Sequence, residues 1–425
     1  MADTDADAGA GSIPPEELAR VRRRTIWVLS IGQVLGGIAF GATISLGAVL
    51  AAEISGDEAF SGLATAFITL GAAALAVPLA AFARRRGRRI SLASGMLLAL
   101  AGVAVVVLAA AVVSFPLLLL AFALIGAGQA ANLQTRFAAA DLATDASRGR
   151  DLSIVVWATT IGAVLGPNLV GPGEILGQAI GMPPLTGPYV FAVVAQLAAI
   201  AVYLIGLRPD PLLLAQRIAR AVANGANAIA RADRPLTARY AIIAIAGAHG
   251  VMVAVMAMTP VHLLHHGASL TIIGLTISLH VAGMFALSPV FGILADRVGR
   301  VATILLGQAL LAASLVTAAI GQESASAVTV ALVLLGLGWS ASTVSGSALL
   351  TESSSEALRT RRQGRSDLIM NLVAAVGAIL AGVILGQIGY GGLALCALSI
   401  VVVVTGLSFL GKSSKPQPAE AIVGR

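Results

Sequence analysis

Two histidines stand near the middle of long apolar segments, where a titratable side chain could carry protons. His249 lies ten residues after Arg239, and His280 lies ten residues after Leu270. At about 1.5 Å of rise per helical residue, each ring is roughly 15 Å from a segment end. Histidine has an unperturbed pKa of about 6.5 and exchanges protons at physiological pH. His249 and His280 are therefore candidates for proton coupling; the alternative is two neutral rings bonded to backbone carbonyls between helices.

Uncharged polar and aromatic side chains form a second group of candidates. Amides donate and accept hydrogen bonds, and an indole ring offers an apolar plate, which together suit a lipophilic or amphipathic solute better than a polyanion. Any one of these residues could equally be a simple interhelical contact, so the prediction concerns the group. The candidates for a substrate cavity are Gln33, Gln129, Asn132, Trp157 and Trp339.

Two further polar groups are assigned no ligand. Arg136, Asn132 and Asp141 form a polar ridge, in which Arg136 is expected to pair within its own bundle rather than to bind a substrate carboxylate. His262, His265 and His266 are close in sequence, but no cysteine or carboxylate accompanies them locally, so no metal site is predicted.

Residues 292–300 read GILADRVGR and connect two apolar segments. Asp296 can cap a helix N-terminus, where the first amides lack partners and the helix dipole favours an anion, and Arg297 and Arg300 can hold carboxylates. An earlier copy keeps Gly87 and Arg88 but has Arg84 in the place of the aspartate. The predicted gate motif consists of Gly292, Asp296, Arg297, Gly299 and Arg300, together with Gly87 and Arg88 of the first copy. In the first copy, the basic run at 84–89 is more simply a topology signal that contacts lipid head groups.

The segment 162–171 reads GAVLGPNLVG. Repeated glycines at Gly162, Gly166 and Gly171 let helices approach closely, and Pro167 removes a backbone donor and permits a bend. Ordinary packing of small residues is the competing interpretation.

The elements that must position these residues are membrane helices. The 425-residue chain is 58% hydrophobic and 11% charged, with a mean hydropathy of +0.93, whereas a soluble domain has about a quarter charged residues. Apolar runs of roughly 20 residues can cross the bilayer core as helices. Twelve such runs are predicted, at 25–52, 61–83, 90–113, 116–142, 152–180, 188–207, 240–264, 270–295, 301–320, 327–351, 367–387 and 390–410.

The 27 Lys and Arg residues all fall on one side of this arrangement, Arg136 being near the same side within the fourth run. The positive-inside rule therefore predicts a multi-pass protein of the cell membrane with both termini in the cytoplasm. Basic loops facing anionic lipid also account for the net charge of +7 without a nucleic-acid partner. The predicted divisions are a tail at 1–24, a bundle at 25–207, an amphipathic linker at 208–239, a bundle at 240–410 and a tail at 411–425.

The chain repeats itself. Gly62, Gly71 and Gly87-Arg88 match Gly274, Gly283 and Gly299-Arg300 at a constant offset of 212 residues, and 149–152 (GRDL) resembles 364–368 (GRSDL). Two six-helix halves in parallel duplication follow from this pattern. By this symmetry the target of Asp296 is expected at the start of the fifth helix, Arg150–Leu152.

Two six-helix halves, the central basic linker and the 292–300 motif together resemble the major facilitator superfamily. The glycine motif of the fifth helix is similar to that of its drug:proton antiporter branch, although Phe122 replaces an arginine of that branch and the first helix lacks an acid. The resemblance implies an all-α integral membrane fold of twelve helices in two pseudo-symmetric bundles, and a gate locked by the loop motif.

The function predicted is secondary active transport by alternating access, most specifically proton-coupled efflux of a small lipophilic or amphipathic solute. Proton symport or facilitated import of a small metabolite is the alternative, and a non-transporting membrane sensor is a third possibility of another class. The chain has no nucleotide-binding glycine loop and no room for a catalytic domain, so it is not expected to be an enzyme. The expected partners are the solute, protons and the bilayer, with no cofactor, no nucleic acid and a monomeric state.

Overall fold

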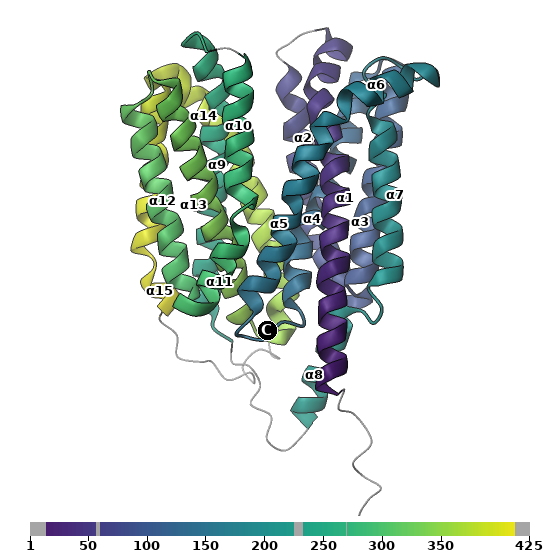
Figure 1. The fold of residues 1–425 in the computed structure, drawn as a ribbon, viewed down its shortest axis with the longest axis vertical. Coiled ribbons are helices and arrows are strands. Elements are labelled where there is room, and N and C mark those ends of the chain that lie inside the picture. The colour runs from purple at the N-terminus through teal and green to yellow at the C-terminus, as the bar shows by residue number, and fades with distance from the viewer. Residues whose placement is uncertain (1–13, 57–59, 225–232, 269, 413–425) are drawn as a thin grey trace, which may run out of the picture.

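The computed structural model describes residues 14–56, 60–224, 233–268 and 270–412. Every element in these ranges is an α-helix, because backbone amides and carbonyls in lipid must be paired within the chain and a helix does this locally. The predicted all-α class is confirmed. Two halves stand side by side (Figure 1): the N half contains α1 to α7, and the C half contains α9 to α15.

The N half is built from α1 (Pro15–Ser55), α2 (Ser61–Arg86), α3 (Arg88–Ala111), α4 (Phe115–Ala140), α5 (Arg148–Asn168), α6 (Val170–Ala179) and α7 (Tyr189–Gly206). The linker forms α8 (Pro211–Asn224). The C half is built from α9 (Pro235–His265), α10 (Leu270–Phe285), α11 (Ser288–Val298), α12 (Arg300–Ile320), α13 (Ala325–Glu352), α14 (Glu356–Gly406) and α15 (Phe409–Lys412).

Ten helical stretches are long and apolar enough to span a membrane in the described ranges. The last, Glu356–Gly411, covers two predicted spans, and Gly389 interrupts its helix with a positive φ of 72°. The predicted fifth span is not among the ten. It divides into α5 and α6 at Leu169, close to Pro172, which lacks the amide that would continue the helix. The count of twelve stays a prediction.

Several helix limits differ from the predicted ones. The first helix begins at Pro15, inside the predicted tail, and α14 begins at Glu356, inside a predicted connection. The predicted eighth span divides into α10 and α11 just before Pro289, again where an amide is missing.

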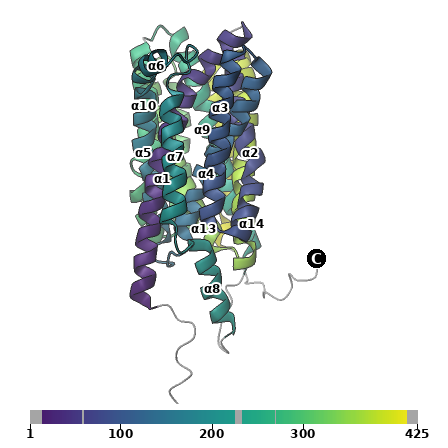
Figure 2. The same ribbon diagram turned by 90° about the vertical axis from the view of Figure 1, so that its right-hand side faces the viewer.

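The arginine-rich ends of the helices lie together, and we call this side of the molecule the basic end. It holds the start of α1, the end of α2 at Arg84–Arg86 and the linker helix α8, which projects beyond the bundle in both views (Figure 2). Each half has its own apolar core, and smaller apolar clusters join the halves: Phe137 packs with the start of α9, and Leu152 and Val156 pack with Val344.

Candidate gate and central site

Asp296, near the end of α11, reaches across to the other half and caps α5. Its Oδ1 accepts from the amide of Gly149 and its Oδ2 from the amide of Arg150, both at 2.9 Å. The first amides of a helix have no partner within the helix, and the helix dipole adds attraction for a carboxylate. The expected contact between Asp296 and the start of the fifth helix is therefore present in the structure.

Close backbone approach accompanies this cap. A Cβ atom added at Gly149 would lie 2.5 Å from the carbonyl oxygen of Gly292, and one added at Gly292 would lie 2.5 Å from the carbonyl oxygen of Gly149. Glycine at both positions lets α5 and α11 touch, and Figure 1 shows these two helices adjacent at the basic end.

Arg300 extends the contact beyond Asp296. Its guanidinium lies 3.0 Å from Asp296 Oδ1 and 3.1 Å from Glu352 Oε2, and it also donates to the backbone carbonyl of Asp145 in the N half. Gly299, with φ of 110°, supplies the turn that separates α11 from α12. Arg297 is exposed and has no carboxylate partner among the described contacts, so the holding of carboxylates falls to Arg300.

In the first copy of the motif, Arg88 makes the contact with the other half. Arg88 is fully buried and donates to Asp141 from Nε at 2.8 Å and to Gln363 of α14 from Nη2 at 2.7 Å. Burial raises the pKa of the Asp141 carboxyl, and the adjacent Arg88 guanidinium opposes that shift. Gly87 repeats the positive φ of Gly299, at 88°.

The structure explains why the first copy has Arg84 where the second copy has an aspartate. Arg84 is exposed, and the residues equivalent to the start of α5 lie inside α14, which begins earlier at Glu356. The amides near Gly364 are already paired within that helix, so a carboxylate at position 84 would have no helix N-terminus to cap there. Instead Asp210 of the linker accepts from the amide of Arg89 at 2.8 Å.

A deeper ion pair joins the halves. Arg136 of α4 donates from Nη2 to Asp367 Oδ1 of α14 at 2.5 Å, and both side chains are buried. The expectation that Arg136 pairs within its own bundle is wrong, because Asp141 is held by Arg88. Asp367 Oδ2 has no hydrogen-bond partner among the described residues. A further contact between the halves, from the Ser288 hydroxyl to the carbonyl of Ser153, lies beside the contact of Gly149 with Gly292.

The predicted cavity residues of the N half collect in two places. Gln33 donates to Thr159 at 2.9 Å and accepts from Thr135 at 3.0 Å, which ties α1, α4 and α5 together. Gln129 and Asn132 line a small recess with Gln196 of α7. The carboxamide oxygen of each of these three residues is buried and has no hydrogen-bond partner in the described structure.

The C half holds the remaining candidates except Trp157, which is 41% exposed on α5. Trp339 is buried, donates from Nε1 to His249 Nδ1 at 2.9 Å, and meets the Phe285 ring edge to face. His280 Nδ1 lies 2.8 Å from the carbonyl oxygen of Leu332, and its Nε2 is buried without a partner among the described groups. Both histidines therefore bond only within the C half in this state.

The glycines of the fifth-helix motif pack against α1. A Cβ atom at Gly162 would lie 2.8 Å from Gly37 Cα, and one at Gly166 would lie 2.7 Å from Gly41 Cα. Gly171 faces open space, and the side chain of Pro167 lies outside the described part of the chain. In this structure Gly162 and Gly166 serve close packing within the N half.

The fold and the contact between Asp296 and the start of α5 define a two-half helical membrane protein, and comparison with known proteins shows its family. The sequence model of the Major Facilitator Superfamily matches residues 29–272 and 240–424. The chain belongs to this family. Members of this family are membrane transporters and not enzymes. This protein is therefore a membrane-embedded transporter.

Two relatives and one solved structure illustrate the match. The uncharacterized MFS-type transporter YddS of Bacillus subtilis (strain 168) is 38% identical over 403 residues, covering 92% of each chain. The riboflavin transporter RfnT of Brucella anthropi is 31% identical over 424 residues, covering 95% of this chain and 99% of that one. The human organic anion transporter MFSD10 has a similar fold, with a TM-score of 0.73 and 16% identity over 93% of this chain and 100% of its own.

Proposed function

We propose that this protein is a proton-coupled secondary transporter that moves a small, uncharged, aromatic solute by alternating access. The basic end faces the cytoplasm, as the distribution of arginines favours, and it is closed in this structure. The observation that carries the proposal is the buried pair of Arg136 and Asp367 between the halves. This pair cannot persist when the halves separate at the basic end.

Protonation of Asp367 is the coupling step that we propose. A carboxylate that is buried and paired with an arginine loses that attraction when it is neutralised, and the freed arginine then favours hydration over burial. A proton on Asp367 thus favours the state with the basic end open. A coupling group must interact differently in the two states; Asp367 does so because its partner belongs to the other half.

The histidines fit this coupling role less well. His249 bonds to Trp339 and His280 bonds to the Leu332 carbonyl, and all four residues belong to the C half. If the halves move as rigid bodies, these bonds are the same in both states. We propose that His249 and Trp339 contribute instead to the substrate site. In this site the C half supplies aromatic rings and the N half supplies side-chain amides.

The solute class follows from the polar groups available. The unpaired oxygens of Gln129, Asn132 and Gln196 require hydrogen-bond donors, since a buried acceptor without a partner is costly. Arg136 and Asp367 neutralise each other, so a charged solute finds no free counter-ion in the described central region. A flat heterocycle with N–H and hydroxyl groups fits both conditions, and the similarity to RfnT makes a flavin the first solute to test.

Drug-type efflux by antiport is the second candidate, favoured by the glycine contact of α1 with α5 that places Gly162 against Gly37. The ion pair of Arg136 and Asp367 is compatible with transport in either direction. In antiport, the unprotonated protein with bound solute changes to the outward-open state. In symport, the unprotonated protein without solute makes this change.

Counterflow in proteoliposomes tests the proposal. Vesicles filled with unlabelled riboflavin should transiently accumulate labelled riboflavin, while vesicles filled with an organic anion should not. Accumulation with ethidium but not riboflavin would select the drug-type solute. Absence of counterflow with both neutral and cationic aromatic solutes would reject transport of this class and favour a non-transporting sensor.

A further inference from the structure

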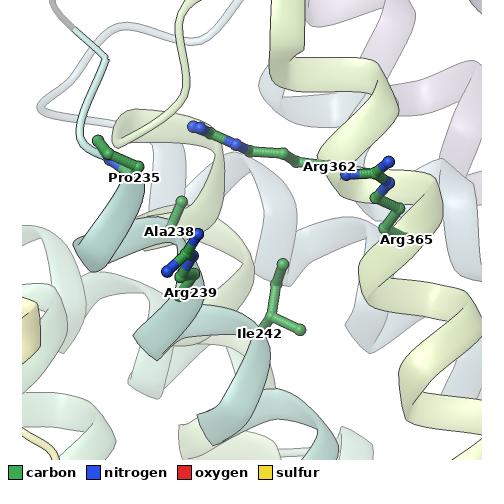
Figure 3. Close-up of a pocket in the computed structure, with 6 residues that line it drawn as sticks. All are labelled: Pro235, Ala238, Arg239, Ile242, Arg362 and Arg365. Carbon is green, nitrogen blue, oxygen red and sulfur yellow. The ribbon is translucent and has the colours of Figure 1, made fainter. Parts of the chain in front are cut away.

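A pocket at the basic end gathers three guanidinium groups from two helices. It lies between α9 and α14 and is lined by Pro235, Ala238, Arg239, Ile242, Arg362 and Arg365 (Figure 3). The arginines surround a floor of apolar side chains, and the pocket is far in the sequence and in the fold from the recess at Gln129. Neither the gate nor the central site uses it.

The charges in this pocket do not cancel. Arg362 is neutralised by Asp233, with Nη1 to Oδ1 at 2.6 Å and Nη2 to Oδ2 at 2.7 Å. Asp233 also accepts from the amide of Ser355, which fixes the end of the linker to the start of α14. Arg239 and Arg365 are exposed and have no acidic partner among the described contacts. Two positive charges therefore remain beside the apolar floor.

We propose that this pocket binds the head group of an anionic phospholipid of the membrane leaflet at the basic end. Arg239 and Arg365 would hold the phosphate, because a planar guanidinium donates two parallel hydrogen bonds to phosphate oxygens. Ile242, about one helical turn beyond Arg239, continues the apolar wall in the direction that an acyl chain would follow. An amphipathic ligand matches this combination better than a small inorganic anion does.

The bound lipid has a definite structural consequence. Both helices of the pocket belong to the C half, and Arg362 already connects that half to the linker through Asp233. The lipid therefore stabilises the C half and the end of the linker without bridging the two halves. It raises the melting temperature and leaves the pH dependence of gating unchanged, so the inference is independent of the proposed function.

The experiment measures lipid binding by native mass spectrometry and melting temperature in detergent. The protein is titrated with phosphatidylglycerol, with phosphatidylcholine and with inorganic phosphate. The test variant is Arg239→Ala with Arg365→Ala. The matched control is Arg20→Ala with Arg23→Ala, which removes the same charge from exposed residues of α1 at the same end of the molecule.

Wild type and the control should bind phosphatidylglycerol in preference to phosphatidylcholine, and the test variant should bind it about 30-fold more weakly, because each basic residue near an anionic head group contributes ~1 kcal/mol. Equal binding of the two lipids by the wild type would overturn the proposal. So would equal losses in the test and control variants. Equal stabilisation by inorganic phosphate alone would show a simple anion site and reject the lipid.

Discussion

Arg136 and Asp367 belong to different halves of the protein, and their side chains meet in a buried ion pair with Nη2 and Oδ1 2.5 Å apart. Around this pair, the hydrogen bonds described between the halves cluster toward the basic end, where Asp296 caps α5 and Arg88 reaches Gln363. The halves are thus held together at one end by groups that must all be released before that end can open.

Asp367→Asn should abolish the pH dependence of transport while the variant still binds solute. The substitution keeps the shape of the side chain but leaves Arg136 buried without a counter-ion, which costs about 3 kcal/mol in the closed state. Opening of the basic end relieves that cost, so the population shifts toward the open state by roughly 100-fold. Counterflow measured across a pH series reports the change.

A double variant provides the control for this prediction. Arg136→Gln together with Asp367→Asn removes both charges, so the closed state should regain much of its stability while the pH dependence stays absent. If Asp367→Asn alone retains the pH profile of the wild type, the coupling proton is elsewhere.

His249→Gln with His280→Gln should preserve the pH profile of transport. Both histidines bond within the C half, and glutamine can still accept the hydrogen bond from Trp339. Affinity for the solute is expected to fall, since we propose that His249 contributes to the substrate site. A lost pH dependence in this variant, with Asp367 intact, would return the coupling role to the histidines.

Asp296→Asn should make the basic end more accessible. The loss of the carboxylate charge weakens the cap on Gly149 and Arg150 by about 1 kcal/mol. Labelling of an introduced cysteine at the basic end measures the change, after Cys396, the single cysteine of the chain, is replaced. Arg297→Gln, one residue along and exposed, is the matched control; equal labelling rates in the two variants would contradict a latch at Asp296.

Gly292→Ala should prevent closure of the basic end. The added methyl group would overlap the carbonyl oxygen of Gly149, which is backbone and cannot move aside. Gly386→Ala is the control, because a Cβ atom there meets nothing within 4 Å and alanine favours a helix over glycine by about 1 kcal/mol. Trapping in one state, seen as solute binding without counterflow, is expected for Gly292→Ala alone. Normal counterflow by this variant would show that α5 and α11 need no such contact.

Much of this arrangement could be predicted from local sequence patterns. The apolar runs predicted most of the helices from the length needed to cross lipid. The capping chemistry of Asp296 indicated a helix start with unpaired amides, and the internal repeat indicated that this start is that of the fifth helix.

The partner of Arg136 could not be found in that way. Asp141 lies five residues along the same helix, and only the packing of α14 against α4 brings Asp367 closer. The resemblance of 364–368 to 149–152 was a usable signal, since it aligns Asp367 with Asp151, which is also buried and paired, with Arg22. Arg84 was harder to interpret, because its lack of a target depends on where α14 begins.

The distance between the halves at the basic end tests the central claim most directly. Spin labels at Arg85→Cys on α2 and Val298→Cys on α11, both exposed positions, with Cys396→Ser, report this distance by pulsed electron paramagnetic resonance. In the wild type, we expect the distribution to lengthen as the pH is lowered, because protonation of Asp367 releases Arg136. In Asp367→Asn the long distance should dominate at every pH. A distribution in Asp367→Asn that still shifts with pH as in the wild type would contradict the account.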